Sequence, residues 1–173
     1  MKYNFDTLLR RQTEDGYAGT ALSKALERLP TVSPVGPWLA GGALRRTLLN
    51  ESLDASDFDF FFAGDQQAAD FEDYMKDIGA KVKFRNDKQT TWCVPGTDGG
   101  EFDGDFPQPP LIVQAIMLKW YASAEDVVDS FDFTLCQFAF DGETLTCGEY
   151  ALWDLGRRMM VPHKITYGVA SIR

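Results

Sequence analysis

The feature that most constrains the fold of this chain is the run DFDFFF that begins at Asp57. Its acidic and apolar side chains alternate, and a period of two is typical of a β-strand whose two faces meet different surroundings. We therefore expect Asp57 and Asp59 to project from one face, while Phe58, Phe60 and Phe62 enter a core on the other. Two carboxylates one strand repeat apart can hold one or two divalent cations.

A glycine pair precedes this strand at the start of a predicted helix. Residues 38–40 read as a short apolar strand that ends at Gly41 and Gly42, and residues 43–49 have helical composition. A turn without side chains at a helix start exposes unpaired backbone N–H groups and the positive end of the helix dipole, which together hold phosphate oxygens. The two motifs therefore predict a nucleotide whose phosphates lie on the turn, against metal bound by the acids.

These motifs together resemble the signature of the DNA polymerase β-type nucleotidyltransferase superfamily, in which a glycine pair, a helix and two acids on a strand follow in this order. Here the helix carries Arg45. A second block resembles the head domain of tRNA CCA-adding enzymes and poly(A) polymerases of that class, and it comprises Asp132-Phe133-Thr134, Ala139-Phe140-Asp141 and Asp154-Leu155. The likeness covers roughly residues 38–160.

The resemblance implies a metal-dependent nucleotidyltransferase that uses Mg²⁺ or Mn²⁺ to move a nucleoside monophosphate from a nucleoside triphosphate to a hydroxyl group. The acceptor would be an RNA end, a protein or a small molecule. Six residues form the implied site, as catalytic metal ligands (Asp57, Asp59) and as nucleotide contacts (Gly41, Gly42, Arg45, Asp132). The resemblance places Asp132 near the sugar, although an acid at the start of a strand also commonly caps a neighbouring turn.

The sequence also departs from the family pattern. Arg45-Arg46 stands where those enzymes read Arg-Asp, and Ser130-Phe131 stands where they have Arg-Arg. The third metal acid of the family usually comes from a later strand, and the polar position of the candidate strand at 111–118 is Gln114. Because a glutamine offers a carbonyl without charge, we expect weaker metal binding. The alternative function is therefore a catalytically reduced binding or assembly module, in a toxin–antitoxin pair or a viral particle.

The order of the predicted elements indicates an α/β (α+β) fold with a mixed, largely antiparallel sheet and helices on one face. We expect residues 1–173 to form a single domain, with N-terminal helices within 5–29 and the core at 37–160. The remaining elements are expected as helices at 5–12, 19–29, 66–78, 124–130 and 150–160, and as strands at 81–85, 90–94, 111–118, 131–140 and 143–147. The strand at 111–118 is apolar enough to be buried on both faces. In the acidic loop at 97–110, Asp103 and Asp105 could supply the acid that Gln114 does not.

Composition narrows the function classes. The three cysteines show no CxxC spacing, so we expect reduced thiols, and the single histidine, His163, argues against zinc centres and Ser-His or Cys-His catalysis. No apolar run is long enough to span a membrane and the first residues do not start a signal peptide, which predicts a cytoplasmic protein without a membrane partner. A net charge of −9 argues against binding to extended duplex nucleic acid and favours a small nucleotide, with an RNA end or protein as acceptor.

Overall fold

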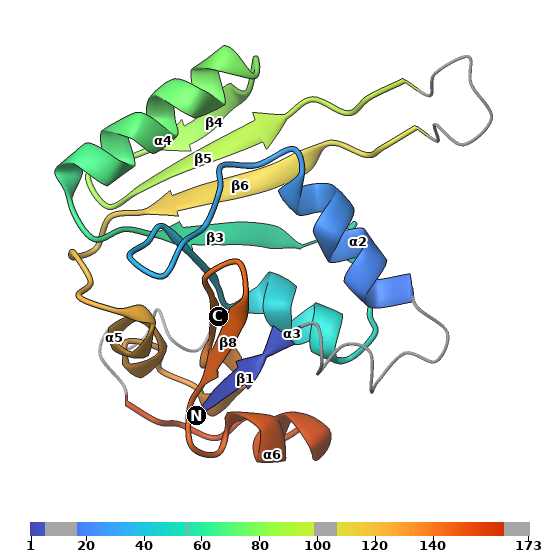
Figure 1. The fold of residues 1–173 in the computed structure, drawn as a ribbon, viewed down its shortest axis with the longest axis vertical. Helices are drawn as coiled ribbons and strands as arrows, with labels where there is room; N and C mark the ends of the chain where they lie inside the picture. Colours follow the sequence, from blue (N-terminus) through green and yellow to red (C-terminus); the bar gives the residue numbers. More distant parts are fainter. Residues whose placement is uncertain (6–16, 55, 99–106, 165–173) are drawn as a thin grey trace.

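The computed structural model describes residues 1–5, 17–54, 56–98 and 107–164. Within these residues eight strands form one sheet in the order β1-β8-β7-β2-β3-β6-β5-β4 (Figure 1). The strands are β1 (Lys2–Asn4), β2 (Trp38–Ala40), β3 (Asp57–Phe61), β4 (Lys81–Arg85), β5 (Gln89–Val94), β6 (Leu111–Ile116), β7 (Phe138–Phe140) and β8 (Thr144–Cys147). The helices are α2 (Tyr17–Leu26), α3 (Gly42–Leu48), α4 (Asp65–Asp77), α5 (Ala124–Asp129) and α6 (Ala151–Gly156), with one 3-10 turn, η1 (Thr134–Cys136).

The sheet is mixed and largely antiparallel, as the sequence predicts. Among the described strands, β3 and β6 form the one parallel pair, and every other neighbouring pair is antiparallel. A parallel pair needs a long crossover, which here consists of α4 and the β4–β5 hairpin. The predicted fold class is confirmed, and β3 lies near the middle of the sheet with β2 and β6 as neighbours.

The larger core lies on one face of the sheet. Phe58 and Phe60 of β3 project into it, and α2, α3 and α4 cover it with Leu22, Leu44 and Met75. All five side chains are at most 2% exposed. Burial of a large apolar side chain contributes about 1.5 to 3 kcal/mol, so this layer stabilises the central strands.

Helix α5 covers part of the opposite face, which contradicts the expectation of helices on one face only. Trp38 of β2 and Phe61 of β3 pack there against Val127 and Val128 of α5. Because successive side chains of a strand point to opposite faces, the continuous apolar runs of β2 and of the end of β3 supply both cores. Figure 1 shows α5 and α6 at the end of the sheet opposite to α4.

Strand β6 does not have the two buried faces predicted for residues 111–118. Leu111, Val113 and Ala115 are buried in the larger core, whereas Gln114 is half-buried on the opposite face. Helix α5 packs on β2, β7 and β8 instead of β6. Of the described helices, none packs on the face that carries Gln114 where β6 lies beside β3.

The strand predicted at 131–140 is also shorter than expected. Only Phe138–Phe140 pairs in the sheet, and residues 134–136 form η1. The interruption has a long-range cause, because the Thr134 N–H donates to the Val161 carbonyl at 3.0 Å and Phe133 forms a bridge with Pro162. Backbone groups satisfied in this way by a distant segment do not join the sheet.

The C-terminal helix is likewise shorter than the expected 150–160. Helix α6 ends at Gly156, and Arg158 has a φ of +53°. The Met159 N–H returns to the Asp154 carbonyl at 2.9 Å, so the chain turns away from the helix axis. Met159, which the longer helix would have directed inward, is exposed.

Some predictions concern residues outside the described part of the chain. Apart from Phe5, the residues of the helix predicted at 5–12 are not described, and neither are Asp103 and Asp105. Strand β1, which pairs with β8, was not predicted. Within the described ranges, no helix combines the length and the apolar character that crossing a membrane requires.

Candidate active site

The two aspartates of β3 share one face of the strand, as their alternation predicts. Asp57 is exposed and Asp59 is half-buried, while Phe58 and Phe60 have no exposed surface on the other face. Asp59 pairs in register with Ala40, the last residue of β2. Because the glycine turn follows Ala40 directly, this register brings Asp59 to the turn.

Gly41 lies beside Asp59. Its φ is +79° and its ψ is −131°, a conformation that residues with a side chain rarely adopt. A Cβ atom built on Gly41 would stand 3.3 Å from Asp59 Oδ2 and 3.6 Å from the Phe131 ring. Both the backbone and the space therefore require glycine here, and the acid beside the turn is Asp59.

The two glycines differ in what their backbone can offer a ligand. The Gly41 N–H donates to the Phe138 carbonyl at 3.0 Å, so it is already used within the sheet. The Gly42 N–H opens α3, has no acceptor among the described residues, and nothing lies within 4 Å of a Cβ built on Gly42. The phosphate contact predicted for the glycine pair therefore remains for Gly42, whereas Gly41 provides space beside Asp59.

Arg45 and Asp132 lie in the same neighbourhood as Asp59. Burial raises the pKa of the Cys136 thiol, the positive charge of Arg45 opposes this rise, and the charges of Asp59 and Asp132 add to it. These three charges must be close to act on one thiol. The fold therefore gathers residues that are far apart in the sequence, on α3, on β3 and on the segment that leads into η1.

A cavity of about 410 Å³ opens beside the acids. Its polar lining includes Asp59, Gln114 and Asp132, and its aromatic wall includes Phe61 and Phe131. The Phe61 and Phe131 rings pack edge to face with centroids 5.6 Å apart. Pockets for small ligands typically measure about 300 to 1,000 Å³ and combine apolar walls with a few polar groups, so the cavity suits a nucleotide.

The carboxyl group of Asp59 is electrostatically strained in the absence of a cation. Burial raises the pKa of Asp59 to about 7, and the negative charge of Asp57 contributes to the rise. A divalent cation between the two groups would relieve both effects, because it replaces lost hydration and offsets the like charges. The donor set therefore fits Mg²⁺ or Mn²⁺, which prefer carboxylate oxygens.

Gln114 occupies the position where the sequence predicts the missing third acid. It pairs in register with Asp59 across the parallel β3–β6 ladder, and its Nε2 donates to Asp57 Oδ2 at 2.8 Å. Over residues 1–5, 17–54, 56–98 and 107–164, no group of three or more His, Cys, Asp or Glu residues forms a possible metal site. The ligand set in the described structure is thus two carboxylates beside an amide.

Gln89 was not among the predicted site residues, and its Nε2 donates to Gln114 Oε1 at 2.9 Å. Alternation in β5 puts Gln89 and Thr91 on the face opposite to the buried Trp92, and that was the available signal. Two further cavity residues, Lys119 and Lys164, were also not predicted. They form ion pairs with Asp126 and Asp129 of α5, and such contacts between distant segments leave no local sequence pattern.

A family model described as "Gabija anti-defense 2 family protein" matches residues 2–158, which is most of the chain. The chain belongs to the Gabija anti-defense 2 family. A relative named Gabija anti-defense 2, from Bacillus phage SPbetaL7, is 29% identical over 128 residues. The alignment covers 74% of this chain and 26% of the relative, so the chain spans about a quarter of the length of that Gabija anti-defense 2 protein.

Solved structures of CCA-adding enzymes share the fold of this Gabija anti-defense 2 chain. A CCA-adding enzyme complexed with CTP superposes with a TM-score of 0.56 and 19% identity, over 92% of this chain and 36% of that enzyme. The Thermotoga maritima CCA-adding enzyme complexed with tRNA gives a TM-score of 0.51 and 15% identity, over 94% and 36%. At such identities the likeness shows a common fold, and the predicted nucleotidyltransferase-like fold is confirmed.

Proposed function

We propose that this protein is a metal-dependent nucleotidyltransferase that moves a nucleoside monophosphate from a nucleoside triphosphate to an acceptor hydroxyl. The observation that carries the proposal is the position of Asp59, beside Gly41 and at the wall of a nucleotide-sized cavity. A half-buried aspartate with its pKa raised to about 7 is costly to stability, and such strongly shifted groups often lie at functional sites. Asp57, one strand repeat away, completes a pair of cation ligands.

In the proposed reaction, Asp57 and Asp59 would hold Mg²⁺ or Mn²⁺. The cation, when bound, supplies positive charge that stabilises the phosphoryl group during transfer. The Gly42 N–H and the Arg45 guanidinium bind the triphosphate, and Asp132 binds the sugar. The acceptor oxygen then attacks the α-phosphorus, the bond to pyrophosphate breaks, and the acceptor proton passes to solvent.

The aromatic part of the cavity wall would bind the base of the nucleotide. Phe61 and Phe131 offer aromatic faces and edges on which a base can pack, and they exclude water from the reacting phosphate. Ser130-Phe131 replaces the Arg-Arg pair of the resembling enzymes, so the base is held more by packing than by charged groups. We therefore expect weak discrimination among the four nucleoside triphosphates.

The acceptor is the less defined partner in this proposal. The net charge of −9 disfavours an extended duplex, which leaves an RNA end, a protein or a small molecule. Since the family is described as Gabija anti-defense, we place the acceptor in the Gabija system and the reaction in the cytoplasm of an infected cell. We also propose that residues 1–173 form one domain.

Thermal unfolding with each nucleoside triphosphate, with and without Mg²⁺, tests this function. We expect Mg²⁺-dependent stabilisation of about 2 to 3 kcal/mol at a hundredfold excess over Kd, and its loss in Asp57→Asn. Asp77→Asn, which changes an exposed acid at the end of α4, serves as the matched control. Equal stabilisation of the wild type and of Asp57→Asn, or none with any triphosphate, would contradict the proposal.

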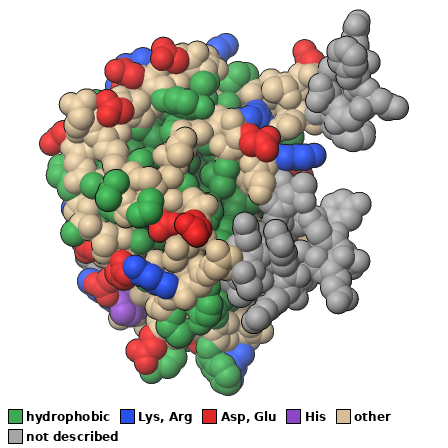
Figure 2. Space-filling model, viewed as in Figure 1, with side chains coloured by type: hydrophobic (Ala, Val, Ile, Leu, Met, Phe, Trp, Pro, Cys, Tyr) green, Lys and Arg blue, Asp and Glu red, His purple; other side chains and the backbone are tan. Residues whose placement is uncertain are grey.

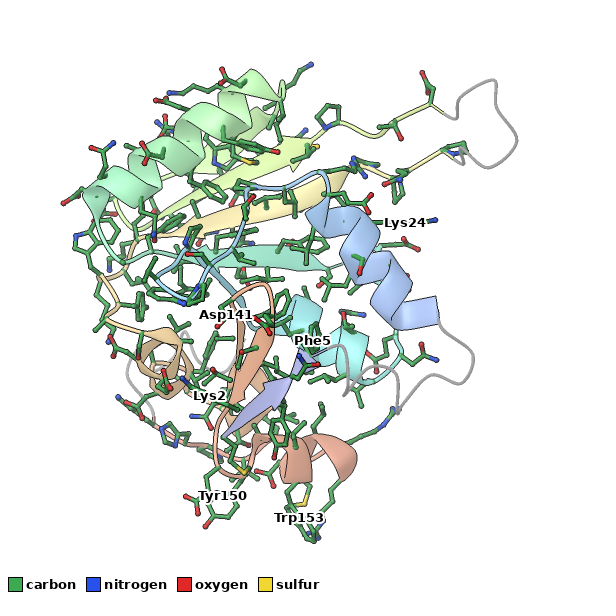
Figure 3. All side chains as sticks on the ribbon, in the orientation of Figure 1. Lys2, Phe5, Lys24, Asp141, Tyr150 and Trp153 are labelled. Carbon is green, nitrogen blue, oxygen red and sulfur yellow. The ribbon has the colours of Figure 1, made fainter. Side chains whose placement is uncertain are left out.

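A second candidate is a binding module that has kept the fold without the chemistry. It is favoured by an apolar surface on and after α6, where Tyr150, Trp153 and Met160 are 58%, 65% and 68% exposed. Figure 3 shows Tyr150 and Trp153 pointing away from the body of the protein, and Figure 2 shows hydrophobic side chains at that end. Exposed aromatic residues and methionines are typical of protein interfaces.

The two candidates predict opposite results in cells that carry Gabija. If the protein is an enzyme, Asp57→Asn abolishes anti-defence activity and Trp153→Ala leaves nucleotide binding intact. If it is a binding module, Trp153→Ala abolishes anti-defence activity and Asp57→Asn retains it. Phage plaque counts with each variant measure the difference.

A further inference from the structure

Three side chains form a hydrogen-bonded row across neighbouring strands next to the cavity. Gln89 lies on β5, Gln114 on β6 and Asp57 on β3, and these strands are adjacent in the sheet. Gln89 Nε2 donates to Gln114 Oε1 at 2.9 Å, and Gln114 Nε2 donates to Asp57 Oδ2 at 2.8 Å. Gln89 Nε2 also donates to Thr91 Oγ1 at 3.0 Å. The row therefore connects Asp57 to two strands besides its own.

The direction of every bond in this row follows from its acidic end. An ionised carboxylate only accepts hydrogen bonds, so Gln114 must present its NH₂ group to Asp57. The Gln114 carbonyl oxygen then points the other way and needs a donor, which is the NH₂ group of Gln89. The orientations of both amides, which are otherwise easily interchanged, are thus fixed by the chemistry of Asp57.

This arrangement has consequences for cation binding. The Gln114 N–H occupies one oxygen of Asp57, and its carbonyl oxygen is engaged by Gln89, so Gln114 directs no oxygen ligand at the acids. The local charge is that of two carboxylates, Asp57 and Asp59, which one divalent cation neutralises. A second cation without nucleotide would find no further carboxylate grouped with these two, since the described residues contain no group of three or more potential ligands.

We propose that the Gln89–Gln114 pair replaces a third metal carboxylate by a hydrogen-bond clamp on Asp57, so that the protein without nucleotide binds a single divalent cation. Gln114 and Gln89 are positioning residues in this proposal, because they orient the metal ligand Asp57 and do not themselves coordinate the cation. The inference rests on the metal role proposed above for Asp57 and Asp59. The inference goes beyond that role, because it specifies how many divalent cations bind and attributes their weak binding to the glutamine at the third position.

Titration with Mn²⁺ alone, followed by calorimetry and by electron paramagnetic resonance, tests this clamp. We expect one Mn²⁺ per wild-type chain. Gln114→Leu and Gln89→Leu keep this number but weaken binding, by about tenfold for Gln114→Leu, because outer contacts that orient a ligand typically contribute that much. Gln114→Glu supplies the third carboxylate, so it binds Mn²⁺ about tenfold more tightly and takes up a second ion.

Melting temperatures give a readout that a merely structural role would not produce. In chelator, Gln114→Glu melts below the wild type because three carboxylates repel one another, and with Mn²⁺ the order reverses. Gln66→Glu is the matched control, since Gln66 Nε2 also donates to an aspartate, Asp70 Oδ1, at 2.8 Å, but on the exposed surface of α4. It should show no reversal. The melting curve in chelator also establishes that each variant is folded.

The outcomes separate this inference from the proposed function. Two ions on the wild type, or Gln114→Glu that binds Mn²⁺ as the wild type does, would overturn the clamp while leaving the metal role of Asp57 intact. Unchanged Mn²⁺ affinity in both leucine variants would also overturn it. Absence of Mn²⁺ binding to the wild type, with no effect of Asp57→Asn, would instead overturn the proposed function itself and the clamp with it.

Discussion

The carboxyl group of Asp59 is pushed toward its neutral form by burial and by the charge of Asp57, so its pKa rises to about 7. In the unfolded chain an aspartate titrates near its ordinary value of about 4. The folded protein therefore binds more protons than the unfolded one between these two values. In the absence of metal, the contribution of Asp59 to the free energy of unfolding therefore falls as the pH rises through this window, and then levels off above pH 7.

Asp59→Asn should remove this pH dependence. An asparagine cannot be charged, so at pH 8 in chelator the variant should be more stable than the wild type by about 2 kcal/mol, a value reduced for the partial exposure of the carboxyl group. Below pH 4 the two proteins should have similar stability. Urea unfolding between pH 4 and 8 measures the effect. A wild type that gains stability over that range would show that Asp59 is not strained in this way.

Gly41 and Gly42 provide a paired test of the turn. Gly41→Ala places a Cβ 3.3 Å from Asp59 Oδ2 at a φ of +79°, so we expect a loss of about 1 to 3 kcal/mol in stability and of nucleotide binding. Gly42→Ala meets no atom within 4 Å and adds a better helix former to α3, so stability should be retained. Thermal unfolding of both variants measures the two changes in stability. Equal losses of stability in Gly41→Ala and Gly42→Ala would argue against the proposed contact between the turn and Asp59.

At the scale of the elements, β3 separates chemistry from packing. Its odd-numbered acids face the open side, whereas Phe58 and Phe60 lie in the larger core under α2, α3 and α4. Parallel pairing with β6 then aligns Asp59 with Gln114 across the ladder. The buried phenylalanine face stabilises the strand, and this offsets the loss of stability caused by the neighbouring carboxylates on its other face.

Mutations on the two faces of β3 should therefore affect different properties. Phe60→Ala should cost about 3 to 5 kcal/mol of stability, because it leaves a cavity in a core where the ring is fully buried. Asp57→Asn should change stability by less than about 1 kcal/mol, since the side chain is exposed, while it abolishes metal-dependent binding. Denaturant titration provides both values. A Phe60→Ala variant as stable as Asp57→Asn would contradict the assignment of faces.

The elements that the sequence predicts well are those with a strong local signal. The alternation in β3 is present, and so is the helix predicted at 124–130, which begins where Ser123 accepts a hydrogen bond from the Asp126 N–H. The break at η1 was missed because its cause is a pairing with Val161 and Pro162, far along the chain. Local composition carries no record of such a partner.

The same distinction holds for the site. Sequence motifs predict the glycine turn, the two acids and the glutamine at the third position, because each follows from strand period or spacing. They do not predict that the Gly41 N–H is used by Phe138, nor that Gln89 holds Gln114, since both depend on which strands become neighbours. Neighbour identity is a property of the sheet order and not of any single strand.

At the scale of the whole molecule, the site lies where the two cores meet on the open face of the central strands. The larger core fixes β3 and β6 from one side, and α5 fixes β2 and β7 from the other. In the proposed function, a ligand would enter at the Gln114 face of β6, which α5 does not cover. A net charge of −9 repels phosphate at long range, so the proposed binding of a triphosphate would require nearby cationic side chains and a metal ion.

The most direct test of the central claim is a crystal soaked with Mn²⁺ and a nonhydrolysable nucleoside triphosphate, measured for anomalous scattering. The account predicts a manganese peak between the carboxylates of Asp57 and Asp59, with the triphosphate extending toward the Gly42 N–H. A triphosphate bound elsewhere, or occupied nucleotide density without manganese at these two aspartates, would contradict it.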